Sequence, residues 1–163
     1  LLMRIGVVSD THDNARNVAR IVEVLNRADV DHVVHTGDIT RGATLEQLAG
    51  IDAPLVGVYG NNDVLREELD AAADRLGIRL AEPPFEAVWE GREILVVHDP
   101  REIEGALREP HDLVLHGHNH LRVHDQTPER LIFNPGECAG HLEGHNAVGV
   151  VDLGTLSAEV LLF

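Results

Sequence analysis

The sequence contains no lysine, so all 13 of its basic residues are arginine, against 28 Asp and Glu residues and a formal net charge of -15. A protein without a basic face releases few counterions from a phosphate backbone, which disfavours binding to a nucleic acid polymer. The composition resembles that of proteins from halophiles that accumulate salt, in which high ionic strength screens self-repulsion. The alternative is an acidic protein encoded by a GC-rich genome.

The sequence also has little cysteine and no long apolar run. Cys138 is the only cysteine, which excludes an internal disulfide and fits a reducing cytosol, and we expect a buried, unreactive thiol there. No apolar stretch approaches the roughly 20 residues that span a bilayer, and the N-terminal residues do not resemble a signal peptide. We therefore expect a cytoplasmic protein with no membrane partner.

Linkers, repeats and low-complexity tracts are missing as well, so the 163 residues are predicted to form a single domain, residues 1–163. In the first half, short apolar runs rich in β-branched residues alternate with segments of helical periodicity. Strands are expected at 3–9, 31–35 and 54–59, and helices at about 15–28, 44–49 and 65–76. This alternation is typical of a parallel sheet with crossover helices.

The second half contains mainly strand-like segments. We expect hairpins at 85–97 and 147–162, a short helix at 101–107, and further strands at 113–115, 121–124 and 130–133. Together the two halves predict an α/β fold, a two-sheet β-sandwich flanked by helices.

Five of the predicted strands end in residues that commonly bind metals. The carboxyl ends of parallel strands meet at one edge of a sheet, where functional residues gather. Histidines two apart in an extended chain point the same way, so His118 and His120 can face one site. That pair alone is a modest signal in a chain with 11 His, but four other strand ends supply matching groups. The candidate ligands are Asp10, His12, Asp38, Asn61, His98, His118 and His120.

Three oxygen donors and four imidazoles are enough for two metal ions if one carboxylate bridges them. Ions held roughly 3.5–4 Å apart by a shared group form the two-metal hydrolytic site, which acidifies a water and clamps a phosphoryl oxygen. A chance assembly would require five separate strand ends to imitate one site. The residues therefore predict a metal-dependent hydrolase.

These motifs resemble those of the calcineurin-like metallophosphoesterases, over nearly the whole chain. That family has Asp-x-His, Gly-Asp, Gly-Asn-His-(Asp/Glu), a lone His and Gly-His-x-His, each after a strand. The short chain and the turn at 134–136 are most similar to its small archaeal and bacterial phosphodiesterase branch. The corresponding segments here are Asp10-Thr11-His12, Gly37-Asp38, Gly60-Asn61-Asn62-Asp63, His98 and Gly117-His118-Asn119-His120.

The resemblance implies a four-layer αββα fold and a ligand assignment. One ion would bind Asp10, His12, Asp38 and His120, and the other would bind Asp38, Asn61, His98 and His118, with Asp38 bridging. The implied nucleophile is a metal-bridging hydroxide that attacks phosphorus in line with the leaving oxygen. Mixed nitrogen and oxygen ligands suit Mn²⁺, Ni²⁺, Fe or Zn²⁺, and we favour Mn²⁺. We expect direct catalytic contributions from Asp38, Asn62 and His118.

Two positions depart from the family pattern. Asn62 stands where the family usually has a histidine implicated in handling the leaving-group oxygen. Asn can donate a hydrogen bond but cannot act as a general acid, so we predict a preference for diesters or activated esters with good leaving groups. Asp99 follows His98 where this branch often has Gly, and we expect its carboxylate to point to solvent rather than to tune the second ion.

Several neighbouring residues have less specific expectations. His35 and His116 precede ligand motifs and are predicted to be supporting or core histidines. Asp63 can cap the following helix, support a ligand residue or do both, and capping alone is a sufficient explanation. Arg41 follows the Gly-Asp motif. It could contact a substrate phosphate, but we favour a position without such a contact.

The predicted function is hydrolysis of a small phosphate ester, most specifically by a phosphodiesterase. The alternative is a non-catalytic, metal-bound protein-interaction scaffold, since a retromer subunit resembles this fold; the intact ligand set argues against it. A nuclease ranks third, because the chain has no basic face. The loops at 41–44 and 137–145 are expected to set specificity, and an oligomer is not required.

Overall fold

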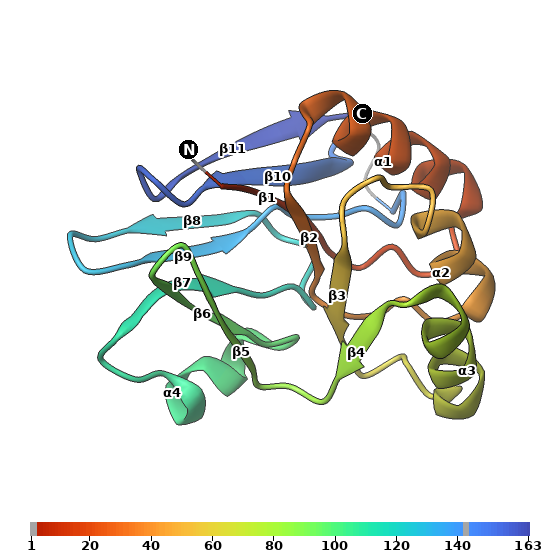
Figure 1. The fold of residues 1–163 in the computed structure, drawn as a ribbon, viewed down its shortest axis with the longest axis horizontal. Coiled ribbons are helices and arrows are strands. Elements are labelled where there is room, and N and C mark those ends of the chain that lie inside the picture. The colour runs from red at the N-terminus through yellow and green to blue at the C-terminus, as the bar shows by residue number, and fades with distance from the viewer. Residues whose placement is uncertain (1–2, 142–143) are drawn as a thin grey trace.

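In a computed structural model that describes residues 3–141 and 144–163, the chain forms two β-sheets with helices on their outer faces (Figure 1). The strands are β1 (Arg4–Val8), β2 (His32–His35), β3 (Leu55–Val58), β4 (Arg79–Ala81), β5 (Phe85–Trp89), β6 (Arg92–Val96), β7 (His111–Leu115), β8 (Val123–Gln126), β9 (Leu131–Asn134), β10 (Ala147–Asp152) and β11 (Ser157–Leu162). The helices are α1 (Ala15–Ala28), α2 (Gly42–Leu48), α3 (Arg66–Leu76), a 3₁₀ turn η1 (Pro100–Glu102) and α4 (Ile103–Ala106).

The first sheet has six strands in the order β11-β10-β1-β2-β3-β4. Its strands β1, β2, β3 and β4 are parallel, and the antiparallel terminal hairpin β10–β11 adds to the free side of β1. The second sheet has five strands in the order β5-β6-β7-β9-β8, of which β6, β7 and β9 are parallel. In both sheets the predicted metal-ligand motifs follow directly after the carboxyl ends of parallel strands.

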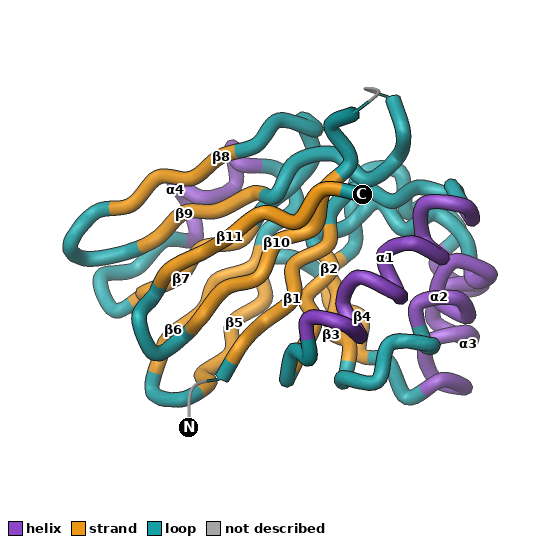
Figure 2. Tube along the Cα trace, turned by 90° about the horizontal axis from the view of Figure 1, so that it is seen from above, coloured by secondary structure: helices purple, strands orange, loops and turns teal. Residues whose placement is uncertain are grey.

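Three apolar clusters show how the layers pack. Alternate residues of β1 point to opposite faces, so Val7 enters the core between the two sheets while Val8 enters the core beneath the helices. Val18, Ile21 and Leu25 of α1 fill the helix-side core at helical spacing. A small third cluster joins α4 to the outer face of the second sheet. The result is a four-layer αββα arrangement, with α1, α2 and α3 on one side and α4 on the other (Figures 1 and 2).

The fold confirms the predicted two-sheet sandwich flanked by helices in a single domain. All the expected strands and helices are present, with ends shifted by a few residues. One element was missed, the three-residue strand β4, which lies at the sheet edge and pairs with β3. Three residues are too few to show an alternating pattern, so the sequence contained no signal for it.

Among the described residues, none of the helices combines the length and apolar character that crossing a bilayer requires.

Candidate metal centre

All seven predicted ligands lie together at the carboxyl ends of parallel strands. Asp10 and His12 follow β1, Asp38 follows β2, and Asn61 follows β3. From the second sheet, His98 follows β6, and His118 and His120 follow β7. The two sheets pack face to face, so the loops after their strands meet across one edge of the sandwich. The structure thus brings together every ligand that the sequence nominated.

Asp38 lies between two groups of donor atoms. Its Oδ2 is 3.6 Å from Nε2 of His12, and its Oδ1 is 3.5 Å from Nε2 of His98. The side chain is almost completely buried. A buried carboxylate whose two oxygens face different histidines has the arrangement that a bridging ligand needs.

On the His98 side, three ligand atoms converge. Oδ1 of Asn61 is 2.9 Å from Nε2 of His98 and 3.0 Å from Nδ1 of His118, and those two nitrogens are 3.2 Å apart. Neighbouring ligand atoms about 2.1 Å from an octahedral ion lie about 3.0 Å from one another. The spacing of these three atoms therefore fits a common cation.

The orientation of His98 fixes which of its nitrogens faces the site. Its Nδ1 lies 2.8 Å from the backbone carbonyl oxygen of Thr36, which can only accept, so Nδ1 carries the proton and donates it. Its Nε2 is the nitrogen directed at Asn61 Oδ1 and Asp38 Oδ1. An imidazole that donates from Nδ1 to a carbonyl and directs Nε2 toward other ligand atoms has the arrangement common among metal-binding histidines.

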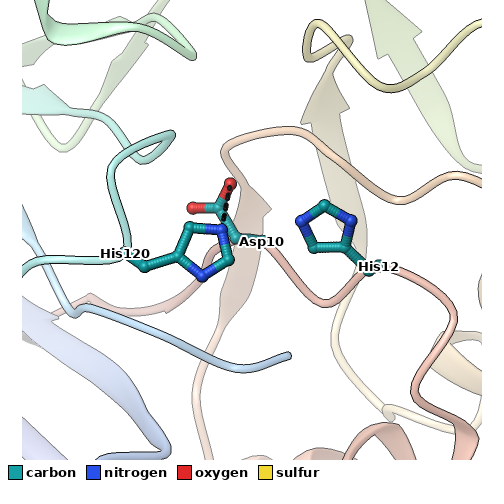
Figure 3. A group of neighbouring side chains, drawn as sticks. All are labelled: Asp10, His12 and His120. Carbon is teal, nitrogen blue, oxygen red and sulfur yellow. Dashed lines mark ion pairs between the residues drawn. The ribbon is translucent and has the colours of Figure 1, made fainter. Parts of the chain in front are cut away.

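On the other side, Asp10 lies between His12 and His120 (Figure 3). The three residues offer ligand atoms within 4.8 Å of one another, and Asp10 Oδ1 is 3.9 Å from Nε2 of His120. Asp10 Oδ2 accepts hydrogen bonds from the Ser9 hydroxyl and the backbone N–H of His118. In contrast, Asp10 Oδ1 and His12 Nε2 are buried without a hydrogen-bond partner. Unpartnered buried polar atoms are costly, and a cation would satisfy both.

The pKa of Asp10 also favours a cation at this position. Burial raises the pKa of its carboxyl, although the Ser9 hydroxyl opposes that change. A positive ion beside Oδ1 would offset the cost of burying the charged form. Asp10 also has an oxygen within 4.8 Å of ligand atoms of Asp38 and His98, so the two halves of the site are contiguous.

The backbone at the site is unusual. Most of the ligand residues have positive φ, a region that residues other than glycine adopt rarely and at a cost of about 1–3 kcal/mol each. Such conformations persist only where the surroundings enforce them, and they concentrate at functional sites. The residues are Asp10 (φ 53°), His12 (φ 49°), Asp38 (φ 62°), His118 (φ 77°) and His120 (φ 60°).

Two glycines in the motifs allow the strand ends to approach each other. A Cβ on Gly117 would lie 2.1 Å from Ser9 Oγ and 2.7 Å from Asp10 Oδ2. A Cβ on Gly60 would lie 2.2 Å from Asp38 Oδ1. Both motif glycines are thus required because a side chain would occupy the space of a ligand carboxylate.

Asn62, the residue that replaces the family histidine, contacts Asp38. Its backbone N–H donates to Asp38 Oδ1 and its side-chain amide donates to Asp38 Oδ2, both at 2.9 Å. The side chain is therefore engaged with the central carboxylate, where it can hold Asp38 in place.

Buried polar residues fix the Asp38 loop from behind. The Asp63 carboxylate accepts from the backbone N–H groups of Gly60, Asp38 and Thr40, at 2.6, 2.9 and 2.6 Å. Of the two roles that the sequence left open for Asp63, capping of α3 is not observed, since the cap position is Leu65, whereas support of the ligand Asp38 is. Asp63 instead ties the loop after β2 to the loop after β3.

The two supporting histidines are both buried, as expected. His35 Nδ1 accepts the backbone N–H of Gly37, and its Nε2 lies 2.9 Å from the Thr11 hydroxyl. Burial lowers the pKa of His35 to about 3 and also lowers that of His116. Both rings are therefore neutral near pH 7.

Asp99 does not point to solvent as expected. It caps η1, binds Arg101, and places Oδ2 3.6 Å from Nε2 of His118. The pKa of Asp99 is lowered to about 2, mainly by the hydrogen bonds from Arg101. The sequence gave no indication of this contact, because it depends on how the turn after β6 folds back toward the loop after β7.

Arg41 is paired with another residue. Its guanidinium donates to both oxygens of Glu68 at 3.1 and 3.3 Å, and Glu68 also accepts from the backbone N–H of Gly42. The hydrogen bond from Gly42, and after it those from Arg41, lower the pKa of Glu68. Arg41 is therefore paired with a residue of α3.

One residue of the site was missed altogether. Glu137 follows the turn at 134–136, is buried, and places Oε1 3.4 Å from Nδ1 of His120. The ring of His141 stacks on that of His120. The sequence signal was weak: a single acidic residue after Asn134-Pro135-Gly136, in a loop expected to set specificity. Residues 142 and 143 of that loop lie outside the described part of the chain.

The chain is similar in sequence and in fold to known phosphoesterases. Residues 3–155 match the sequence profile of the calcineurin-like phosphoesterase superfamily domain. A phosphodiesterase of Methanocaldococcus jannaschii is 30% identical over 154 residues, covering 92% of this chain and 93% of the relative. The solved structure of an archaeal phosphodiesterase superposes with a TM-score of 0.90 at 27% identity, over 99% of this chain and 100% of that one. Vps29 of Entamoeba histolytica shares the fold, with a TM-score of 0.67 at 16% identity over 99% of both chains.

Proposed function

The chain belongs to the calcineurin-like phosphoesterase superfamily, and from this premise we propose that it is a binuclear metal-dependent phosphodiesterase that hydrolyses a small phosphate ester. The observation that carries the proposal is the position of Asp38. One buried carboxylate faces His12 with one oxygen and His98 with the other, so two sets of donors share a central ligand. The phosphodiesterase relative from Methanocaldococcus jannaschii supports the choice of substrate class.

In this proposal the first ion is held by Asp10, His12, Asp38 and His120, and the second by Asp38, Asn61, His98 and His118. When bound, two divalent ions supply positive charge for the phosphoryl oxygens and lower the pKa of a shared water. We favour Mn²⁺, with Ni²⁺, Fe and Zn²⁺ as alternatives, because a mixed set of imidazole, carboxylate and amide ligands suits all of them.

The chain's own residues supply position and charge. Asn62 holds Asp38 through a hydrogen bond to each carboxylate oxygen. Among the catalytic residues we propose, Asp38 and His118 act as ligands, and Asn62 also offers an amide donor at the site. An amide cannot protonate a leaving group, so diesters and activated esters with good leaving groups are the preferred substrates.

The acidic composition supports a further property, adaptation to high salt inside a cytoplasm. With 28 acidic and 13 basic residues, self-repulsion destabilises the fold unless salt screens it. The free energy of unfolding is therefore expected to rise between about 0.1 M and about 1 M KCl, where the Debye length falls from about 10 Å to about 3 Å. A midpoint of urea unfolding that does not rise with salt contradicts a halophilic protein.

The function is tested by metal analysis together with a substrate screen. Purified protein is loaded with Mn²⁺, the metal content is measured, and hydrolysis of bis-p-nitrophenyl phosphate and a panel of cyclic nucleotides is followed. The expected result is two ions per chain and diester hydrolysis that a chelator abolishes. Asp38→Asn serves as the inactive control, with activity lowered by at least about 10³-fold, since metal stabilisation of the transition state is worth several kcal/mol.

The same experiment separates the enzyme from a scaffold. Vps29 of Entamoeba histolytica, a vacuolar protein sorting protein, has this fold, so the fold by itself does not establish an enzyme. Metal-loaded protein that is inert toward every ester in the screen would favour a protein-interaction scaffold. Full activity in Asp38→Asn would overturn the role of Asp38 as the bridging ligand.

A further inference from the structure

Two carboxylates outside the ligand set lie behind the adjacent histidines His118 and His120. Glu137 Oε1 is 3.4 Å from Nδ1 of His120, and Asp99 Oδ2 is 3.6 Å from Nε2 of His118. On the inner side, His120 faces Asp10 with Nε2, whereas His118 faces Asn61 with Nδ1. The two histidines therefore present different nitrogens to the site, and each has a carboxylate on the opposite nitrogen.

We propose that Glu137 and Asp99 are positioning residues that hold His120 as its Nδ1–H tautomer and His118 as its Nε2–H tautomer, each presenting the other nitrogen to one half of the metal centre. This inference rests on the proposed function. The tautomer of a neutral histidine is set by the acceptor that its N–H group meets. An acceptor behind a metal-binding imidazole also orients the ring and raises its basicity. His98 has the same arrangement, with the Thr36 carbonyl as acceptor.

Glu137 is well placed for this role because the loop fixes its carboxylate. The side chain is buried, and it accepts from the backbone N–H groups of Gly140 (3.2 Å) and His141 (2.8 Å). A buried carboxylate is costly unless it is paired, and these two amides leave Oε1 directed toward His120. Glu137 therefore connects the loop after β9 to the half of the site that contains Asp10.

The geometry disfavours a third metal site formed by His120, Glu137 and His141, although their ligand atoms lie within 4.8 Å of one another. The two imidazole rings are stacked, with centroids 5.1 Å apart and planes only 7° apart. An imidazole binds a metal in its ring plane, and one ion cannot lie in two separated parallel planes.

Asp99 is the weaker of the two orienting groups. Its distance to His118 is that of an ion pair rather than a hydrogen bond. Arg101 also donates a hydrogen bond to the same carboxylate oxygen, from Nη2 to Oδ2 at 2.5 Å. We therefore expect a smaller effect at His118 than at His120.

The test uses Glu137→Ala and Asp99→Ala, which remove the acceptor behind each ring. Ring ¹⁵N shifts of the metal-free protein report the tautomers directly. The expected result is that His120 loses its Nδ1–H preference only in Glu137→Ala, and His118 its Nε2–H preference only in Asp99→Ala. Unchanged tautomers in both variants would overturn the inference. Glu137→Gln is the matched control, because its amide oxygen can still accept from the ring and from the loop amides, and it should keep the Nδ1–H preference of His120.

Calorimetric titration with Mn²⁺ then assigns each carboxylate to one half of the site. In an Asn61→Ala background, where the half containing Asp10 is expected to bind the remaining ion, Glu137→Ala should weaken Mn²⁺ binding 10–100-fold, the usual effect of losing such a partner. In a His12→Ala background it should change affinity less than about twofold, while Asp99→Ala weakens binding by about tenfold. Equal effects of Glu137→Ala in both backgrounds would overturn the assignment. Wild-type protein that binds two ions but hydrolyses no ester contradicts the proposed function alone.

Discussion

Asn62 donates a hydrogen bond to each carboxylate oxygen of Asp38, one from its backbone N–H and one from its side-chain amide, both at 2.9 Å. The residue that departs from the family pattern thus holds the central carboxylate of the site. Hydrogen bonds to a charged group contribute about 1.5–3 kcal/mol, so this contact is a substantial constraint on Asp38.

Substitution of Asn62 should separate its hydrogen bond to Asp38 from its inability to protonate a leaving group. Asn62→Ala removes the bond to Asp38 Oδ2 and is expected to lower hydrolysis of all esters by a similar factor of about tenfold. Asn62→His introduces a group that can protonate a leaving oxygen, an effect worth up to about 10²–10⁴-fold. The measurement is kcat/KM for diesters with p-nitrophenyl and alkyl leaving groups. An unchanged ratio between these esters in Asn62→His argues against a leaving-group deficit in the natural chain.

Gly117→Ala should disrupt the site while leaving the fold intact. The added Cβ would lie 2.1 Å from Ser9 Oγ and 2.7 Å from Asp10 Oδ2, so the loop that contains His118 must move. A displacement of about 1 Å at reacting groups costs about 10²-fold in rate, and Mn²⁺ binding should weaken in parallel. Gly105→Ala is the matched control, because a Cβ there meets open space and helix propensity improves by up to about 1 kcal/mol. Wild-type metal affinity in Gly117→Ala would contradict the close approach of these loops.

Stability should depend on pH through His35. Burial lowers its pKa from 6.5 to about 3, so between these values the unfolded chain binds a proton that the folded chain does not. The free energy of unfolding therefore falls as pH is lowered through this window, by up to about 1.4 kcal/mol per pH unit from this residue. His35→Asn keeps an acceptor for the Gly37 amide and removes the titration, so its stability should fall less between pH 7 and pH 5.

Urea unfolding of metal-free protein at several pH values provides the measurement. His124→Asn, an exposed substitution, should retain the wild-type slope. Parallel pH profiles for wild-type protein and His35→Asn would show that His35 is not the group responsible.

Cys138 should resist thiol reagents in the folded protein. It is fully buried, donates from Sγ to the Ala147 carbonyl at 2.9 Å, and burial raises its pKa to about 12. The thiolate is the reactive form, so modification by Ellman's reagent at pH 8 should proceed only as fast as the protein opens. Ser157→Cys, at an exposed strand position, provides a reactive reference in the same chain. Rapid stoichiometric labelling of wild-type protein would contradict the burial of Cys138.

The order of elements and the candidate ligands could be read from the sequence because both depend on local patterns. Runs of β-branched residues indicate buried strands, and a motif directly after such a run lies at a strand end. The carboxyl ends of parallel strands lie at one edge of a sheet, so motifs far apart in the chain, such as those of Asp10 and His98, can be assigned to one site from the sequence.

Other features depended on contacts between distant segments. The sequence contained no sign that Asp63 would accept three backbone N–H groups, that Asp99 would turn toward His118, or that Glu137 would lie behind His120. Each is a single acidic residue in a chain with 28 of them, and a periodic pattern cannot distinguish one from another.

The sequence by itself determined which side chains gather at the edge of the sandwich, since strand periodicity and topology are sufficient for that. Only the tertiary structure decided how those side chains face one another. His118 and His120 are two residues apart, yet one turns Nδ1 and the other Nε2 toward the site. Their ring orientations depend on acceptors brought in from the turn after β6 and the loop after β9, and such long-range packing leaves no mark on the local sequence.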